Sequence, residues 1–275
     1  MMKIEVTAPN DPAALLKAMD DASGYCLLPE SLNKRVERGG QEWIQDTFGV
    51  RDRWKVIERH LGKRDIGAVM DLGGHSGYFS LSAVESGFAT SARVYDLDTR
   101  ALTVGALSAR LMSIEDRVTF IQEPLSIDFV ENMPSSDSIF CLNLIHHAGS
   151  TFDTEAVKSG GWHDYAMRWL SALRAKANFA VVGIGYKGRS KPAEWHAPFY
   201  QRPRIFSELV RNTGWTIEYS GNVADIGTLG MRFADGLREH VLVNKMLHKM
   251  HKKINGMRRW PRKTASYHLY ILIRE

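Results

Sequence analysis

The amino-acid sequence predicts an α/β protein with a doubly wound sheet of seven strands. Apolar strand patterns alternate with helical patterns over most of the 275 residues, which is typical of parallel strands joined by crossover helices. The first strand, residues 66–72, ends in an acidic residue and a glycine-rich turn, and a helical pattern follows at residues 78–85. Such a strand–turn–helix unit brings backbone to a ligand at the carboxyl edge of a parallel sheet. We therefore expect a ligand site at that edge.

The remaining strands and helices continue this alternation. Helical stretches carry apolar residues three and four positions apart, whereas strand stretches are short apolar runs bounded by polar residues or glycine. The further predicted strands are residues 92–98, 117–122, 137–147, 178–186, 215–219 and 266–274. The further predicted helices are residues 100–112, 162–176 and 203–213.

An amino-terminal helical cap is expected before the α/β domain. The cap spans residues 1–64. Within it, residues 31–64 are rich in charge, and their apolar side chains favour helices that cover the ligand edge of the sheet, where they could shape a pocket or only shield apolar surface. The α/β domain is predicted at residues 65–275, with a helical insert at about 221–265. The hydrophobic content of 44% is enough for one large core.

The glycine-rich turn reads DLGGHSG over residues 71–77. Asp71, Gly73 and Gly77 match the first motif of the class I S-adenosylmethionine (SAM)-dependent methyltransferases, which the turn resembles. His75 stands where that family has its middle glycine, and Gly74 lies beside it. No lysine follows in the order of a phosphate-binding loop, and the glycine spacing differs from the dinucleotide fingerprint.

The resemblance implies a Rossmann-like fold, SAM as the cofactor, and a last strand that lies antiparallel beside the fifth. Asp96 ends the second strand, where an acid can accept hydrogen bonds from ribose hydroxyls, although it could instead cap the next helix. Asp98 or Thr99 is the other candidate for that cap. The family often places an adenine-contacting acid after the third strand, where this chain offers Gln122 or Glu123. The expected cofactor-binding residues are Asp71, Gly73, Gly74, His75, Gly77, Asp96, Leu97, Glu123 and Asn143.

The fourth predicted strand ends in the polar sequence NLIHH, residues 143–147. It resembles an Asn-x-x-His-His variant of the family's fourth motif, which implies that Asn143, His146 and His147 lie at the reaction end. A neutral imidazole could take the proton of an attacking hydroxyl. Alternatively, the histidines only hold the loop, because alignment of donor and acceptor can supply most of the rate. No metal is expected, since adjacent histidines in a strand point to opposite sides and no acidic or cysteine cluster accompanies them.

A basic window occupies residues 240–263, with eight lysines and arginines and no acidic residue. Its apolar residues recur every three or four positions, which predicts an amphipathic helix. Such a helix could lie on an anionic membrane surface, bind the phosphates of a nucleic acid, or pack on the body of the protein as a solvated helix.

The sequence thus predicts a SAM-dependent methyltransferase, with O-methylation of a sugar hydroxyl or phosphate of a surface glycan or lipid-linked precursor as the favoured reaction. The basic window and the aromatic loop at residues 195–200 favour that acceptor. An RNA methyltransferase, a small-molecule natural-product O-methyltransferase and a non-catalytic SAM-binding protein are the alternatives. Two cysteines, no secretory pattern and no long apolar run lead us to expect a cytoplasmic protein, or one attached peripherally at the inner membrane face.

Overall fold

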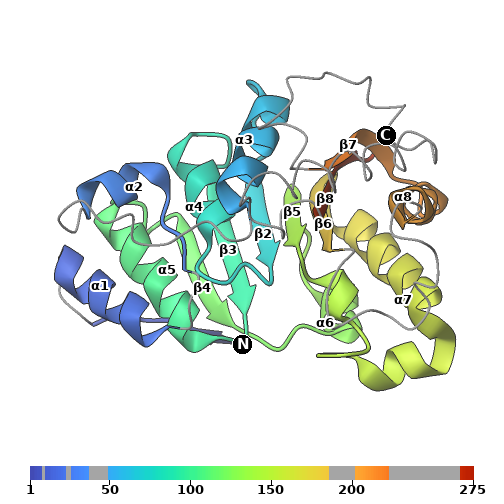
Figure 1. The fold of residues 1–275 in the computed structure, drawn as a ribbon, viewed down its shortest axis with the longest axis horizontal. Coiled ribbons are helices and arrows are strands. Elements are labelled where there is room, and N and C mark those ends of the chain that lie inside the picture. Colours follow the sequence, from blue (N-terminus) through green and yellow to red (C-terminus); the bar gives the residue numbers. More distant parts are fainter. Residues whose placement is uncertain (8–9, 23–25, 37–48, 186–201, 223–266) are drawn as a thin grey trace, which may run out of the picture. The chain divides into compact units, whose positions relative to one another are not determined.

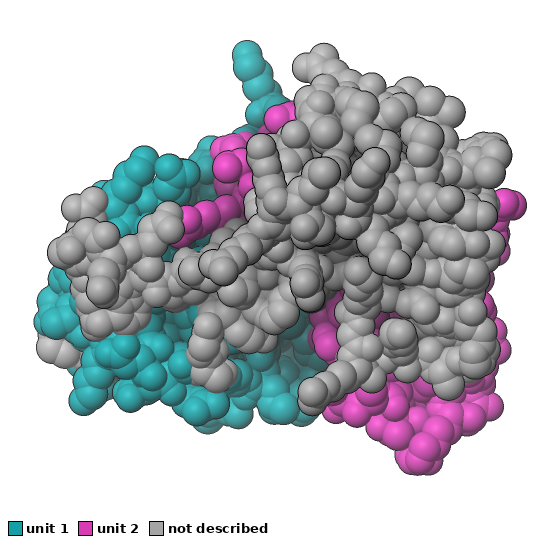
Figure 2. All heavy atoms as spheres, viewed as in Figure 1, with its two compact units in different colours: residues 1–46, 61–125, 136–141 teal, residues 47–60, 126–135, 142–275 magenta. Residues whose placement is uncertain are grey.

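The structure is a computed structural model that describes residues 1–7, 10–22, 26–36, 49–185, 202–222 and 267–275. The basic window at 240–263 and the aromatic loop at 195–200 lie outside these ranges. Unit 1 consists of Met1–Asp46, Leu61–Leu125 and Ser136–Cys141, and unit 2 of Thr47–His60, Ser126–Ser135 and Leu142–Glu275. Figure 2 colours the two units separately, and each is described here by itself.

The described parallel strands of unit 1 lie where the first four strands were predicted, although the fourth ends before residue 147. They are β2 (Ala68–Leu72), β3 (Ser91–Asp96), β4 (Val118–Gln122) and β5 (Ser138–Leu142). Their order is β4-β3-β2-β5, and all neighbours are parallel. The short strand β1 (Met2–Lys3) adds antiparallel to β4 and brings the described strands of the sheet to eight instead of seven. Two residues are too short for a periodic pattern, which is why β1 was not predicted.

The strand order creates a switch point at the carboxyl end of β2. From β2 the chain moves outward through β3 and β4, and β5 then pairs with the other side of β2. In open α/β sheets, ligands bind in the crevice at such a point, because the flanking connections diverge there. The glycine-rich turn follows β2 directly, so the topology supports the ligand edge predicted from the sequence.

Four helices are found among the described residues of unit 1, and the amino-terminal pair packs on the last of them. The helices are α1 (Pro12–Asp21), α2 (Glu30–Arg35), α4 (Tyr78–Glu85) and α5 (Thr99–Leu111). A cluster of buried apolar residues joins the amino-terminal segment to α5; its members include Leu15, Met19, Cys26, Leu28, Leu32, Ala101, Val104 and Leu107. Each large apolar side chain buried in this way contributes about 1.5–3 kcal/mol. This cluster fixes the amino-terminal segment next to the helix that follows Asp96 (Figure 1).

The described part of unit 2 contains three strands, β6 (Phe179–Gly185), β7 (Thr216–Asn222) and β8 (Tyr267–Ile273). Their order is β6-β8-β7, and β8 is antiparallel to both neighbours. This confirms the expectation that the last strand lies antiparallel beside the fifth predicted strand. The helices of this unit are α3 (Val50–Leu61, which belongs here up to His60), α6 (Ile127–Asn132), α7 (Thr154–Lys176) and α8 (Arg202–Asn212).

Helix α7 begins before the predicted helix at residues 162–176. Gly161 breaks the helical geometry with φ 83° and ψ 161°, so the segment before it is a separate helical turn. Trp162 and Trp169 follow the break and are fully buried, which explains why the apolar periodicity starts there. Among the described residues, no helix is long and apolar enough to cross a membrane.

Candidate functional site

The turn predicted to bind the cofactor, residues 73–77 and called the cofactor turn below, is held against the neighbouring strands by its backbone. The N–H groups of Gly73 and Gly74 donate to the carbonyl oxygen of Tyr95 at 2.8 and 3.2 Å. Gly77 adopts a left-handed conformation, with φ 72°, at the start of α4. A Cβ on Gly77 would lie 2.8 Å from a ring carbon of Phe120. Glycine is therefore required here for the turn to pack against β4.

Asp71 lies beneath the cofactor turn and is almost fully buried, with 1% of its surface exposed. Its Oδ2 accepts a hydrogen bond from the Ser80 hydroxyl at 2.8 Å, whereas its buried Oδ1 accepts none. A Cβ on Gly74 would lie 2.6 Å from the carboxyl carbon, so the turn closes directly over Asp71. Burial raises the pKa of Asp71 to about 7, and the negative charge of Asp96 contributes to the same direction.

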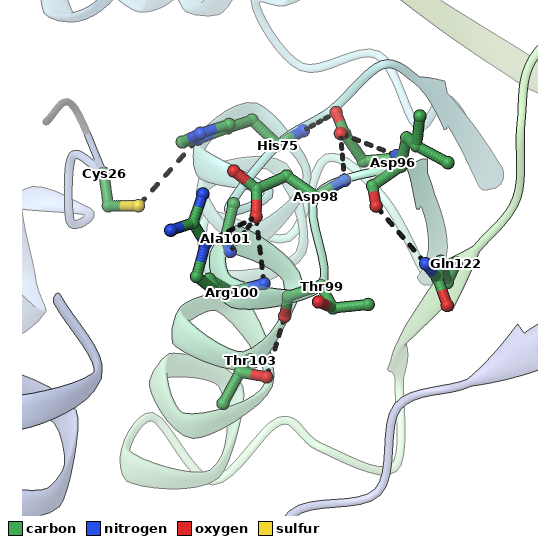
Figure 3. A network of polar contacts seen from close by, with 10 residues as sticks. Cys26, His75, Asp96, Asp98, Thr99, Arg100, Ala101, Thr103 and Gln122 are labelled. Atoms are coloured by element: carbon green, nitrogen blue, oxygen red, sulfur yellow. Dashed lines mark hydrogen bonds and ion pairs between the residues drawn. The ribbon is translucent and has the colours of Figure 1, made fainter. Parts of the chain in front are cut away.

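Asp96, at the end of β3, organises the backbone around the cofactor turn (Figure 3). Its Oδ2 accepts from the N–H of His75 at 2.9 Å, and its Oδ1 accepts from the N–H groups of Leu97 and Asp98 at 2.8 and 3.0 Å. Its carboxylate is half-buried and retains lone pairs for further donors. Helix α5 is capped by Asp98, which accepts from the N–H groups of Arg100 and Ala101. The cap is thus supplied by Asp98, and the ribose role of Asp96 stays a prediction.

His75 connects the cofactor turn to the amino-terminal segment. It has a positive φ of 54°, an unusual conformation for a residue with a side chain. Its Nδ1 lies 3.9 Å from Sγ of the buried Cys26. Burial lowers the pKa of His75 against the opposing effect of Asp96 and Asp98, and burial raises the pKa of Cys26 to about 11. Cys26 was not among the predicted site residues, because 49 residues separate it from His75 and no motif includes it.

The two candidates for the adenine contact differ in their surroundings. The side-chain nitrogen of Gln122 lies 3.5 Å from the carbonyl oxygen of Leu97, directly beside Asp96 (Figure 3). The carboxylate of Glu123 lies 2.8 Å from the amino nitrogen of Met1. Leu97 is 63% exposed, which is unusual for a large apolar side chain. Gln122 and Leu97 are therefore better placed than Glu123 to line a ligand that contacts Asp96.

The histidine turn, residues 143–147, is not part of a strand. Strand β5 ends at Leu142, Asn143 is left-handed with φ 64°, and residues 145–147 form a 3-10 turn. The prediction of a strand up to residue 147 is wrong at this end, because a left-handed residue cannot continue a strand. The rings of His146 and His147 lie 4.2 Å apart, so the argument that they point to opposite sides does not hold. Within the described ranges there is no cluster of His, Cys, Asp and Glu that could hold a metal ion.

His146 is buried and has a defined hydrogen-bonding role. Its Nδ1 accepts from the N–H of Gly185 at 3.2 Å, so the neutral ring carries its proton on Nε2. Burial lowers the pKa of His146 to about 3, with the charges of His147 and the buried Arg53 acting in the same direction. An imidazole whose acceptor nitrogen is engaged in this way is a poor general base. The geometry therefore favours a loop-holding role for His146.

His147 and Asn143 are the other candidates in this turn. His147 is half-buried, and burial lowers its pKa, which keeps the ring neutral near pH 7. The Asn143 N–H donates to the carbonyl oxygen of Gly183 at 2.9 Å, whereas its buried side-chain oxygen has no hydrogen-bond partner. His147 can thus accept a proton, and Asn143 can accept a hydrogen bond from a ligand.

Comparisons with known proteins support the fold. No protein-family model matches the chain, and no curated protein matches it. The structure of the [4+2]-cyclase SpnF is similar with a TM-score of 0.50 and 11% identity, over 96% of this chain and 93% of that chain. This likeness confirms the predicted Rossmann-like, doubly wound α/β fold.

Two other solved structures are similar at lower TM-scores. TrmK of M. capricolum, in complex with S-adenosyl-homocysteine (SAH), has a TM-score of 0.42 and 12% identity over 81% of this chain and 67% of that chain. An O-methyltransferase family protein from Burkholderia thailandensis has a TM-score of 0.46 and 10% identity over 80% of this chain and 56% of that chain.

Proposed function

We propose that this protein is a SAM-dependent methyltransferase. The observation that carries the proposal is the contact between the cofactor turn and Asp96, in which the His75 N–H donates to the carboxylate at 2.9 Å. This contact lies at the carboxyl end of β2, where the strand order switches. A half-buried acid at that place can also accept hydrogen bonds from a ribose diol.

The residues around the cofactor turn fit a SAM molecule. Asp96 would hold the ribose hydroxyls, and Leu97 and Gln122 would lie against the adenine. The orphaned Oδ1 of Asp71 is an acceptor that an ammonium group or an ordered water would satisfy. When bound, SAM supplies an electrophilic methyl group on a positively charged sulfur. The protein's task is then to align an acceptor and to receive the proton that the acceptor releases.

We assign the reaction end to the histidine turn, on the resemblance of residues 143–147 to the family's fourth motif. His147 would receive the proton of a hydroxyl, since its ring is neutral and half-buried. His146 would hold the turn through Gly185, and Asn143 would accept a hydrogen bond from the ligand. A neutral proton acceptor suits an oxygen nucleophile, which supports O-methylation over methylation of an already nucleophilic amine.

The proposed acceptor is a sugar hydroxyl or phosphate of a surface glycan or lipid-linked precursor. Support comes from the basic window at 240–263 and the aromatic loop at 195–200, which would contact an anionic or sugar-bearing acceptor. An RNA acceptor is the first alternative, because the same basic window could bind nucleic-acid phosphates.

A different function on the same fold is the second candidate. The likeness to SpnF, which is described as a [4+2]-cyclase, extends over nearly all of both chains. A fold shared with a cyclase does not by itself fix the reaction, since function depends on the site. A SAM-binding protein without methyl transfer is therefore the alternative that experiment has to separate.

The deciding experiment is calorimetric titration of the purified full chain with SAM and SAH. Asp96→Ala is expected to weaken binding about 10- to 100-fold, since charge-assisted hydrogen bonds contribute about 1.5–3 kcal/mol. Asp116→Ala, an exposed acid of the same unit, is the matched control and should bind like the wild type. A folded wild type that binds neither molecule would overturn the proposal.

Methyl transfer is then measured with isotope-labelled SAM and three acceptor classes, namely lipid-linked glycans, RNA and small hydroxylated molecules. Transfer to the glycans supports the preferred acceptor, and transfer to RNA replaces it with the first alternative. Binding of SAM without transfer to any class would favour the non-catalytic alternative.

A further inference from the structure

The amino-terminal segment around Cys26 is anchored beside the cofactor turn. Cys26 belongs to the apolar cluster that joins α1 and α2 to α5, and only 2% of its surface is exposed. Ala101 and Val104, in the first turns of α5, are members of the same cluster. Because α5 starts immediately after the Asp96–Asp98 segment, the cluster fixes Cys26 close to the residues that surround Asp96 (Figure 3).

His75 bridges Cys26 and Asp96 with two different parts of the same residue. Its ring nitrogen Nδ1 lies 3.9 Å from the Cys26 sulfur, and its backbone N–H donates to Asp96 at 2.9 Å. The ring occupies a position where the resembled family has glycine, which has no side chain to reach the amino-terminal segment. A side chain at φ 54° is less favourable than glycine would be at this position.

An independent observation indicates that the cofactor turn is built for a ligand. Asp71, directly under Gly74, has a buried Oδ1 that accepts no hydrogen bond, and only 1% of the residue is exposed. A buried carboxyl oxygen without a donor is destabilising in the absence of a bound molecule. This unsatisfied acceptor beneath the turn is a second observation that favours a ligand at the turn that His75 connects to Cys26.

We propose that Cys26 is a positioning residue of the cofactor site, and that docking of the amino-terminal segment and cofactor binding are coupled through the His75–Cys26 contact. The inference rests on the proposed function, since the cofactor is taken to be SAM or its product SAH. Coupling is reciprocal, so a cofactor that favours the docked segment must bind more tightly when the segment is docked. Cys26 takes no part in the chemistry; it acts on the turn through the His75 ring and through its hydrogen bond with the neighbouring Ser76.

The first test compares variants that remove either end of the contact. His75→Asn removes the ring and keeps a residue that tolerates positive φ, and Cys26→Ala removes the thiol. Each is expected to raise the SAH dissociation constant about 5- to 20-fold, within the range usual for coupled sites. The double variant should have an SAH dissociation constant no higher than that of the single variant with the larger effect, because both changes break the same contact. Cys141→Ala, an equally buried thiol in β5, is the control and should bind like the wild type.

The second test reports docking directly and needs no change at Cys26. In the Cys141→Ala background, the reaction of Cys26 with a thiol reagent measures how often the amino-terminal segment opens. Saturating SAH is expected to slow this reaction at least 5-fold, and His75→Asn should speed it and remove the effect of SAH. A purely structural cysteine would react at a rate that does not depend on SAH.

The outcomes separate the two proposals. If the wild type binds SAH but the dissociation constant stays within twofold in both variants and SAH does not change the labelling rate, the coupling is refuted and the proposed function stands. If the folded wild type binds neither SAM nor SAH, the proposed function is refuted, and the coupling with it. Weaker binding in both variants together with SAH-dependent labelling supports the coupling.

Discussion

The cofactor turn after β2 and the histidine turn after β5 are similar in backbone conformation but differ in the charge of the side chains around them. Each begins beyond a parallel strand and contains a non-glycine residue with positive φ, His75 at 54° and Asn143 at 64°. Each also has a buried side-chain oxygen without a hydrogen-bond partner, in Asp71 and Asn143 respectively. Carboxylates surround the cofactor turn, whereas two imidazoles and a buried guanidinium define the histidine turn. The first suits donors such as hydroxyls, and the second suits a group that loses a proton.

The strongest expected contrast is between binding and turnover. His147→Ala should lower the rate of methyl transfer about 100-fold or more, since a general base contributes roughly 10²–10⁴. SAM affinity should stay unchanged, because His147 belongs to the histidine turn. Rates are measured with the acceptor that the screen identifies, and affinities by calorimetry.

The exposed His163 provides the control for this comparison, as His163→Ala should change neither quantity. Unchanged turnover in His147→Ala would remove the base from the mechanism and leave alignment as the source of the rate. A loss of SAM affinity in His147→Ala would contradict the division of roles between the two turns.

The next effect concerns stability and the buried Asp71. Its pKa is raised from 3.8 to about 7, so the folded state holds a proton that the unfolded state releases, and stability falls as pH rises from about 4 to 7. Asp71→Asn removes this dependence. Between pH 5 and pH 8 the free energy of unfolding of the variant should rise by roughly 2–3 kcal/mol relative to that of the wild type. Urea unfolding at both pH values measures the change, with Asp116→Asn as the control. If the free energy of unfolding of Asp71→Asn and of the wild type changed equally with pH, Asp71 would not be a buried carboxyl group with a raised pKa.

His146 should produce a pH dependence of the opposite sign. Its pKa is lowered from 6.5 to about 3, so the unfolded state gains a proton first and stability falls as pH drops below about 6.5. Between pH 7 and pH 5 the contribution of His146 to the free energy of unfolding of the wild type should fall by about 2 kcal/mol. His146→Asn keeps an acceptor for the Gly185 N–H and should lack this loss. Thermal unfolding across this range tests it, and an identical acid loss in both proteins would show that His146 is not a buried neutral imidazole.

The smallest expected effect concerns the non-glycine residue with positive φ that each turn contains. Asn143→Ala should destabilise the protein by about 1 kcal/mol more than Asn143→Gly, because alanine tolerates positive φ poorly. The same order is expected for His75→Ala and His75→Gly. Denaturant unfolding of the four variants gives both differences. Equal stability of the alanine and glycine variants at either site would mean that the turn relaxes there.

Much of the fold could be predicted from the sequence because its elements carry periodic signals. The helix at Tyr78–Glu85 was predicted with its observed bounds, and the cap by Asp98 followed from the residue type and its place before a helical pattern. Strand β1 and helix α6 escaped prediction because two and six residues carry too little periodicity. Local patterns thus suffice where an element is long enough to repeat.

The candidate sites were only partly predictable. Motif spacing selected both the cofactor turn and Asp96 as candidates, and the hydrogen bond between them became visible only in the structure, where β2 and β3 are neighbours. The end of β5 was misjudged because apolar residues continue through Leu144 and Ile145, and only the left-handed Asn143 breaks the strand. Cys26 was missed because its contact with His75 depends on how the amino-terminal helices pack on α5, which no local pattern encodes. Tertiary packing therefore decides the parts of the site that motifs leave open.

The two-residue strand β1 also bears on solubility. Strand β4 would otherwise present unpaired N–H and C=O groups at the margin of the unit 1 strands, and such a margin can recruit a strand from another molecule. Met2 and Lys3 occupy part of it, and the Ile4 N–H adds a hydrogen bond to the carbonyl oxygen of Phe120. A strand this short, which carries a lysine, is a poor template for further growth. We therefore expect the pairing of β1 with β4 to lower the tendency of this edge to pair with another molecule.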